Sequence, residues 1–592
     1  MGNTWSLNEL YSSFESAEFI RDLKDLSVAL AEIKQWTETN LKTDSQPKDA
    51  ADLILNFIKK VESLERFHKM VDYANLVLAV DCENAAAMKM FDRVNTSLNE
   101  LSGPNTVFRN FLSGVKDWET AVNDPKLAEY YFVINEMRDE SKYLLTEKEE
   151  ILLARLRGTG SDAWQKLWEQ LTGTLMVRLV KDGKETEQPL TVIRNLANSP
   201  SAAERKIAYE AELKSYENID TKAAAALNSI KGEANTESDT RGYKSVLEMT
   251  LLNARMDERI LNSMFGVMKE YLPHFARYFR HKAKLLGHKD GLPFYDLFAP
   301  VGESKSKYTY PEAAELVFEV FGDFSESLRG YAKNAYDNNW IDVLPHEGKV
   351  GGAFCSSVND IRETRILLNF GGNFDDVMTM AHELGHGYHD HCMKTEKFMN
   401  RGYSMPIAET ASTFCETMLA NHVLKNASKA EALYILEKDI MESGQVIVDI
   451  YSRFLFEDEV INRRREGVLS APELKDIMIR AQKAAYGSGL DSETLHPYMW
   501  VCKPHYYYVS SNYYNFPYAY GLLFAKGLYS QYLADKGSFP KKYRQMLANT
   551  GKMNLRDVGK YMGIDVADPA FWKSSLEIIK REIDQFCSFS EA

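Results

Sequence analysis

The stretch His382-Glu383-Leu384-Gly385-His386 constrains this chain more than any other part of the sequence. Two histidines four positions apart on a helix lie on one face, about 40° apart, so both imidazoles can bind one metal ion. Glu383 is offset from His382 by roughly 100°, which suits a carboxylate beside the metal. Zinc held by neutral imidazoles acidifies its water, and a glutamate can take the proton. The sequence therefore predicts two zinc ligands, His382 and His386, and a general base, Glu383.

A third ligand is expected from another element, because catalytic zinc has three protein ligands and one open position. The stretch from Pro406 to Glu416 predicts a second helix, with Pro406 near its start. Glu409 and Glu416 are seven residues apart, which places them on one face of that helix, about 20° apart around its axis. Two carboxylates on a largely apolar helix are costly to bury without a cation. We predict that Glu409 binds zinc and that Glu416 orients a ligand histidine; the alternative is two solvated glutamates.

His389 is an alternative third ligand, since it lies three residues after His386. Three ligands on one helix would strain the coordination geometry, so Glu409 is preferred. The stretch Phe374-Asp375-Asp376 predicts the start of the zinc helix, capped by one of its aspartates. Gly385 inside this helix costs roughly 1 kcal/mol relative to alanine. That cost indicates the close approach of another backbone or a substrate, or a simple packing need.

Two short apolar runs precede the zinc helix, from Gly351 to Val358 and from Arg365 to Phe370. Both predict strands. An exposed strand edge at this place could hold a peptide by main-chain hydrogen bonds, which tolerates many sequences. The alternative is a buried hairpin that only supports the helix.

Tyrosines and histidines are dense from His496 to Tyr508 and again from Asn512 to Gly521. Most tyrosines are packing residues with a solvated hydroxyl. Hydroxyls and imidazoles are nevertheless the donors that a tetrahedral oxyanion needs, so the block is a candidate part of the site.

The chain resembles the M3 family of zinc peptidases, and within it the oligoendopeptidase F branch; thimet oligopeptidase and neurolysin are more distant. The resemblance rests on His-Glu-Leu-Gly-His, on a glutamate 23 residues after His386 inside Ala-Glu-Thr-Ala-Ser-Thr, and on the tyrosine-rich block. It is strongest from about Gly351 to Ala525 and weak before Lys116. It implies a mostly helical, two-lobed shell around a deep cleft, with a small β-sheet beside the zinc helix. It also implies one Zn2+ per chain and peptides of limited length as substrates.

The resemblance further implies that His505 and Tyr518 polarise the scissile carbonyl. The family pattern Pro-His-aromatic-Tyr followed by Tyr-Ala-x-Gly matches the chain at Pro504 and at Tyr518. The interval between His505 and Tyr518 is slightly longer than usual, so Tyr514 and Tyr520 remain alternatives. Tyr520 stands where a small residue is expected.

A chain of 592 residues is too long for one core, so two to four domains or lobes are expected. Helical periodicity predicts an N-terminal helical lobe over 1–112. By resemblance, 113–200 is an oligoendopeptidase F-type N-terminal domain and 201–592 is the zinc peptidase catalytic domain. Within the second domain, Leu175–Val180 and Glu185–Val192 flank an Asp-Gly pair, which predicts a hairpin.

Composition narrows the partners. The net charge is −14, and an acidic chain of this kind suggests no basic surface that would bind phosphates. This argues against a nucleic-acid partner. Six cysteines without CxxC pairs indicate a reduced, intracellular protein. We expect no signal peptide and no membrane partner, because no basic segment leads into an apolar run and no apolar stretch could span a bilayer. The expected location is cytoplasmic, and the oligomeric state stays open.

These features predict a zinc-dependent oligoendopeptidase that hydrolyses internal bonds of short unstructured peptides. One alternative is an exopeptidase of the same family, either a carboxypeptidase or a dipeptidase. Another is an inactive helical scaffold that binds peptides. The presence of the predicted general base, Glu383, argues against this alternative.

Overall fold

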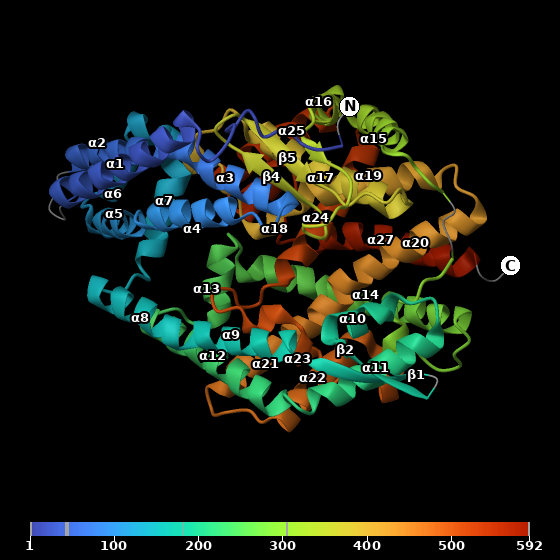
Figure 1. Cartoon of the computed structure of the whole chain (residues 1–592). Helices are drawn as coiled ribbons and strands as arrows, with labels where there is room; N and C mark the ends of the chain where they lie inside the picture. The colour runs from blue at the N-terminus through green and yellow to red at the C-terminus, as the bar shows by residue number, and fades with distance from the viewer. Residues whose placement is uncertain (1–2, 42–46, 182, 303–305, 590–592) are drawn as a thin grey trace.

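The computed structural model describes residues 3–41, 47–181, 183–302 and 306–589. Helices dominate these ranges, and the sheets are small (Figure 1). Among the described residues, no helix combines the length and the apolar composition needed to cross a membrane. The predicted mostly helical fold is confirmed.

The first hydrophobic cluster is built by the N-terminal helices. Helix α1 shows why the sequence folds this way: Phe19, Leu26 and Leu30 recur on one buried face, and the Ser16 hydroxyl caps the start. The helices of this group are α1 (Ala17–Asn40), α2 (Pro47–Glu62), α3 (Glu65–Val80), α4 (Ala85–Asn99), α5 (Ser102–Gly114), α6 (Trp118–Val122) and α7 (Tyr131–Ser141).

The second cluster joins segments that are distant in the sequence. Trp168 of one part packs against Tyr507 of the other, with ring centroids 4.5 Å apart. Its earlier elements are α9 (Ser161–Gly173), α10 (Leu190–Asn195), α11 (Ala202–Tyr216) and α12 (Asp220–Arg241), and α8 (Glu147–Thr159) packs against α9 outside the cluster. Its later elements are α21 (Ile450–Arg464), α22 (Ala471–Tyr486), α23 (Met499–Cys502) and the short turn η8 (Pro504–Tyr507).

The predicted hairpin is confirmed. Strands β1 (Met176–Lys181) and β2 (Lys184–Pro189) pair antiparallel, with Lys181 opposite Lys184. Asp182 of the predicted turn lies outside the described residues, and Gly183 has a φ of +74°. The second strand is shorter than predicted because α10 begins at Leu190.

The largest cluster surrounds α17, the helix that carries His382 and His386, and extends to the C-terminal helix. Buried Lys526 of α24 joins two other helices, through Asp439 of α20 at 2.8 Å and Glu582 of α27 at 3.2 Å. The helices of this group are α13 (Val246–Asn253), α14 (Glu258–Leu285), α15 (Tyr310–Phe324), α16 (Glu326–Asp337), α17 (Phe374–Met393), α18 (Met405–Ala408), α19 (Thr410–Leu424), α20 (Lys429–Gly444), α24 (Phe516–Ala534), α25 (Phe539–Asn549), α26 (Leu555–Tyr561) and α27 (Pro569–Phe589).

A three-stranded sheet lies against helix α17. Strand β5 (Glu363–Leu367) is central, with β4 (Phe354–Val358) antiparallel on one side and β3 (Ile341–Asp342) parallel on the other. The two predicted strands are present, although the second ends at Leu367 instead of Phe370. Strand β4 is at an edge of the sheet. It therefore keeps one row of main-chain groups outside the sheet pairing.

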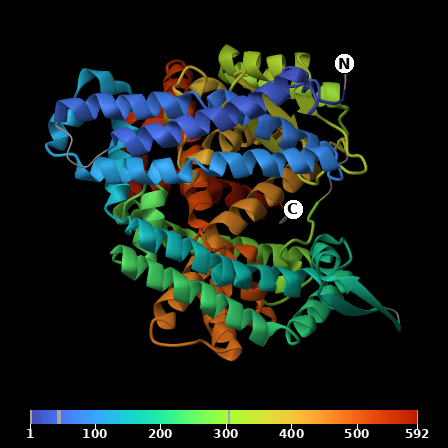
Figure 2. The same ribbon diagram turned by 60° about the vertical axis from the view of Figure 1, so that its left-hand side comes forward.

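Two views show how these groups are arranged (Figures 1 and 2). Helices α1–α7, the sheet and α17 lie in one half, and α8–α12 with α21–α23 lie in the other. The predicted two-lobed arrangement is therefore present, and we call these halves the first lobe and the second lobe. The predicted domain boundaries at 112 and 200 stay predictions, since packing clusters alone do not define domains.

Candidate metal centre and active site

Helix α17 begins with a reciprocal cap. The Asn373 side chain accepts from the Asp376 N–H at 3.0 Å, and the Asp376 carboxylate accepts from the Asn373 N–H at 3.0 Å. The prediction of an aspartate at the cap position is therefore wrong. Asp376 acts from three residues inside the helix, where an acid can reach back, and it also accepts from Gly371 N–H at 2.9 Å.

Gly385 sets the distance between α17 and α19. A Cβ atom at Gly385 would lie 2.6 Å from Ser412 Cα and 2.7 Å from the Ala411 carbonyl oxygen. Both atoms belong to the backbone of α19 and cannot rotate away. The expected close approach of another backbone at this glycine is confirmed, and it brings the glutamates of the second helix to the histidines.

The chain breaks its helix at Glu409. The predicted single helix from Pro406 to Glu416 is wrong in this respect, because α18 ends at Ala408 and α19 begins at Thr410. Glu409 has ψ near 2° at the junction. Its carboxylate accepts from the Ser412 hydroxyl at 3.0 Å. The break turns this side chain toward α17.

Three donor atoms meet at this junction. His382 Nε2 and His386 Nε2 are 3.1 Å apart, and Glu409 Oε2 lies 3.4 Å from each of them. A tetrahedral zinc site with bonds of about 2.1 Å has ligand–ligand edges of about 3.4 Å. Two imidazoles and one carboxylate are also a donor set typical of catalytic zinc. The residues therefore fit a zinc ion.

Glu416 holds the far side of one ring. Its Oε1 atom lies 3.2 Å from His382 Nδ1, so the Nδ1–H can donate to it and the Nε2 lone pair faces the other two donors. Burial opposes charge on His382, but Glu409 and Glu416 outweigh burial and raise its pKa to about 11. The two imidazoles in turn hold the pKa of Glu409 well below its usual range, against burial. The cluster thus concentrates negative charge that attracts a cation.

His389, the alternative ligand, turns away from this cluster. Its Nε2 atom lies 2.8 Å from the Thr550 hydroxyl, and its ring stacks on Tyr403 with centroids 4.2 Å apart. Burial lowers its pKa to about 3. Its contacts are those of a neutral core histidine.

Glu383 lies next to the donor cluster, only 6% exposed. Burial raises its pKa, while His382 and His386 oppose this effect. Strand β4 packs on the same helix, since a Cβ atom at Gly387 would lie 3.3 Å from Cys355 Sγ. Glu383 therefore belongs to a helix that contacts both α19 and the edge strand.

Tyr518 lies in the first turn of α24, close to Glu409. Its hydroxyl donates to the Tyr514 hydroxyl at 3.2 Å. Burial, Tyr514 and the charge of Glu409 all raise the pKa of Tyr518, so the hydroxyl stays protonated and can donate. Gly521 of the same helix supports this contact, since a Cβ there would lie 3.1 Å from Glu409 Cβ.

Tyr520 points away from the Tyr518 side of α24 and into the core. It is fully buried and packs on Phe524 and Trp572, with centroids 5.4 and 5.3 Å apart. Two residues along a helix correspond to about 200°, which explains why Tyr518 and Tyr520 face different surroundings.

His505 belongs to the second lobe. Its ring packs on Tyr506, and its Nε2 atom is buried without a hydrogen-bond partner in the part of the chain that the structure describes. Burial and then the charges of Arg453 and Lys503 lower its pKa to about 2, so the ring is neutral. These charged neighbours are not residues of the metal cluster. The charges that act on His505 thus belong to the second lobe, whereas Tyr518 lies beside the predicted ligand Glu409.

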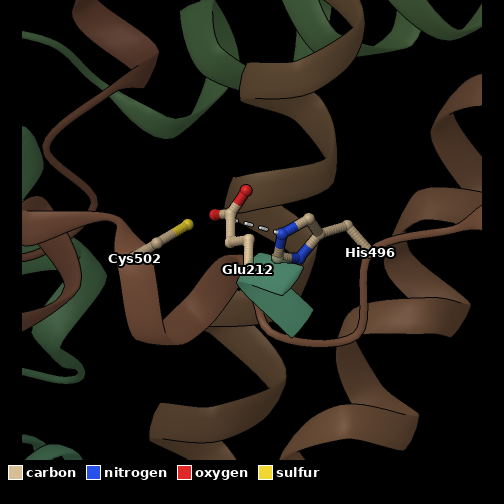
Figure 3. A group of neighbouring side chains, drawn as sticks. All are labelled: Glu212, His496 and Cys502. Atoms are coloured by element: carbon tan, nitrogen blue, oxygen red, sulfur yellow. Dashed lines mark ion pairs between the residues drawn. The ribbon is translucent and has the colours of Figure 1, made fainter. Parts of the chain in front are cut away.

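A second group of potential metal ligands lies elsewhere, formed by Glu212, His496 and Cys502 (Figure 3). His496 Nδ1 accepts from the Tyr498 N–H at 3.2 Å, so Nε2 carries the proton and faces Glu212 Oε1 at 3.5 Å. The Arg194 guanidinium lies 3.2 Å from the same oxygen. A cation is thus already present, and the group is an ion-paired part of the second lobe.

Two residues that support Glu409 were missed by the sequence analysis. Ser412 carries a local signal, because a serine three residues on can reach back to the start of a helix. Gly521 carries none, since its contact with Glu409 joins segments more than 100 residues apart.

Comparisons with known proteins match nearly the whole chain. A model described as peptidase family M3 matches residues 195–578, and one described as oligopeptidase F matches residues 114–176. Oligopeptidase PepF of Bacillus subtilis is 26% identical, over 98% of this chain and 86% of that protein. An oligoendopeptidase F homolog of Lactococcus lactis is 25% identical, over 98% and 96%.

Solved structures agree on the fold. A crystal structure from Chlamydophila abortus has a TM-score of 0.85 at 21% identity, covering 99% of this chain and 98% of that one. Oligoendopeptidase F from Enterococcus faecium has a TM-score of 0.71 at 21% identity, covering 97% and 99%.

Proposed function

Because the chain belongs to peptidase family M3, we propose that it is a zinc-dependent oligoendopeptidase that hydrolyses internal bonds of short unstructured peptides. The supporting observation is the meeting of His382 Nε2, His386 Nε2 and Glu409 Oε2 within 3.4 Å, beside buried Glu383. A metal-binding donor set next to a carboxylate of raised pKa suits hydrolysis better than binding alone.

His382, His386 and Glu409 would hold the zinc ion, and Glu416 would fix the ring of His382. When bound, zinc supplies a Lewis acid that polarises the scissile carbonyl and acidifies water.

Glu383 is the proposed general base. Its carboxylate takes a proton from the attacking water as the new C–O bond forms, and it then delivers this proton to the amide nitrogen as the C–N bond breaks. Burial favours this exchange because it raises the pKa of the carboxyl group and brings the accepting and donating forms closer in energy.

Tyr518 and His505 are the proposed donors to the oxyanion. The Tyr518 hydroxyl stays protonated beside Glu409, and His505 offers a ring nitrogen that has no other partner among the described residues. Donors held in place before the reaction stabilise developing charge without reorganisation.

The proposed place for the substrate main chain is the free edge of β4. An added strand would pair with Phe354–Val358, and this strand packs on α17, the helix that carries Glu383. Main-chain pairing is sequence-tolerant and needs an extended peptide, which supports short unstructured substrates.

The test is cleavage mapping by mass spectrometry on matched peptides with free ends and with both ends blocked by acetyl and amide groups. An endopeptidase is expected to cut both forms at the same internal bonds. A carboxypeptidase or dipeptidase would not cleave the blocked peptides, and an inactive scaffold would cleave neither form. Either outcome would overturn the proposal.

A further inference from the structure

A cavity of about 220 Å³ lies in the second lobe, next to the loop that carries His505. Its walls include α10, α11, the turn η3 (Phe294–Asp296) and Lys503. The π-helical turn η5 (Gln445–Asp449) contributes Gln445 and Asp449 to the same wall. Single π-helical turns inside helices occur frequently at functional sites.

The acidic groups of this wall already have cationic partners. Glu212 Oε1 lies 3.2 Å from Arg194 Nε and accepts from the Tyr216 hydroxyl at 2.7 Å. In Figure 3 the same carboxylate also faces His496. Asp449 forms a hydrogen-bonded ion pair with Arg453. Neither carboxylate forms a hydrogen bond or an ion pair within 4 Å with Lys503.

One cation in the wall remains unpaired. Arg205 is paired with Asp296 at 2.7 Å. Lys503 has no hydrogen bond or ion pair within 4 Å among the described residues, although it lines the cavity. Burial and then the charge of Arg453 lower the pKa of Lys503, and the charge of Asp449 opposes them. An ammonium group in such a place is costly unless an anion accompanies it.

We propose that Lys503 anchors a binding site for a small carboxylate of amino-acid size. Lys503 supplies the charge for the carboxylate, and Tyr209 and Phe294 with Ile193 and Ala208 supply an apolar surface for a short side chain. The volume of 220 Å³ accommodates a molecule of this size and excludes a long peptide.

The position of this site in the chain links it to His505, whose role in catalysis rests on the proposed function. Lys503 is joined to Pro504 and His505 in sequence, and proline fixes its own backbone angle. A ligand on Lys503 therefore holds the segment that presents His505. The binding itself does not depend on the proposed function and is measured without turnover.

The test compares N-acetylleucine with its neutral amide by calorimetry and by thermal unfolding of the purified chain. The carboxylate is expected to bind and to raise Tm with concentration, and the amide to do neither. Lys503→Met is expected to weaken binding at least about tenfold, because it removes the charge and keeps the bulk. Loss of a charge that has no ion pair among the described residues should not prevent folding.

Lys475→Met is the matched control. Lys475 lies in the same lobe but already contacts Asp220 and the Tyr498 hydroxyl, so the variant should bind N-acetylleucine as the wild type does. Equal binding by Lys503→Met and wild type would overturn the site, as would equal binding of acid and amide. Tighter binding of inorganic phosphate than of N-acetylleucine would mean a simple anion site and would also overturn the proposal.

Discussion

His382 is held between two carboxylates, which act on different ring nitrogens. Glu409 Oε2 faces Nε2 at 3.4 Å, and Glu416 Oε1 faces Nδ1 at 3.2 Å. At the scale of single residues the metal site therefore extends beyond its three donors, because the orientation of a ligand ring depends on what its other nitrogen touches.

Glu416→Ala tests this supporting contact. We expect zinc affinity to fall by about 10–100-fold, because the His382 ring loses the acceptor that fixes its proton. Competition with a chelator measures the affinity. Glu416→Gln keeps an acceptor oxygen, so its zinc affinity should fall less than that of Glu416→Ala. Glu409→Ala removes a proposed ligand, so its zinc affinity should fall more. Unchanged affinity in Glu416→Ala would show that the contact does not tune the ligand.

Tyr518→Phe tests the oxyanion donor. A hydroxyl used only in the transition state should lower kcat by roughly 10²–10³ when it is removed, with KM nearly unchanged. Tyr520→Phe is the control: the Tyr520 hydroxyl is buried in the core and has no hydrogen-bond partner among the described residues, so kcat should stay the same. A rise in KM alone for Tyr518→Phe would instead assign Tyr518 to substrate binding.

Some site residues could be predicted from the sequence because their geometry is local. His382 and His386 share a helix face by spacing alone, and the apolar surroundings of Glu409 made it a candidate ligand. The place of His505 could not be predicted, since it depends on how the second lobe packs. The roles of all these residues stay predictions until variants are measured.

At the scale of elements, the contact of α17 with α19 depends on one missing side chain. Gly385 lets the backbones of the two helices touch at Ala411 and Ser412. The sequence predicted both helices, but it missed the break at Glu409 and the cap by Asn373. It also missed β3, because a two-residue strand is too short to show alternation and forms only by pairing with β5.

Gly385→Ala should separate these helices. We expect about 1–3 kcal/mol less stability and weaker zinc binding, because the new methyl group meets backbone that cannot rotate away. Denaturant unfolding measures the stability. Gly266→Ala in α14 is the matched control: it meets nothing within 4 Å and should stabilise by about 0.5–1 kcal/mol. A Gly385→Ala variant as stable as wild type would contradict the close contact.

At the scale of the whole molecule, the chain passes from the first lobe to the second between α7 and α8. It is back in the first lobe at the sheet and α17 (Figure 1). The mostly helical, two-lobed shape was expected from resemblance and is confirmed. The pairing of α21–α23 with α9–α12 was not predicted, because periodicity within a helix does not say which distant helix will cover it.

Size selection is the prediction for the whole molecule. We expect a short peptide to be cleaved, and the same sequence in an exposed loop of a stable folded protein to be almost untouched. An extended peptide can pair with the edge of β4 next to α17, whereas a folded domain would have to open first. Mass spectrometry measures both rates, and the unfolded host protein is the control. Equal rates for the peptide and the folded loop would contradict the expectation that folded proteins are excluded from the site.

The most direct test of the central claim measures zinc content and peptide hydrolysis together in wild type and Glu383→Gln. The wild type should hold one zinc per chain and cleave peptides. Glu383→Gln keeps the size of the side chain but accepts no proton, so it should retain the zinc and lose at least about 10²-fold in kcat. Near-normal turnover by the zinc-loaded variant would contradict the assignment of Glu383 as general base.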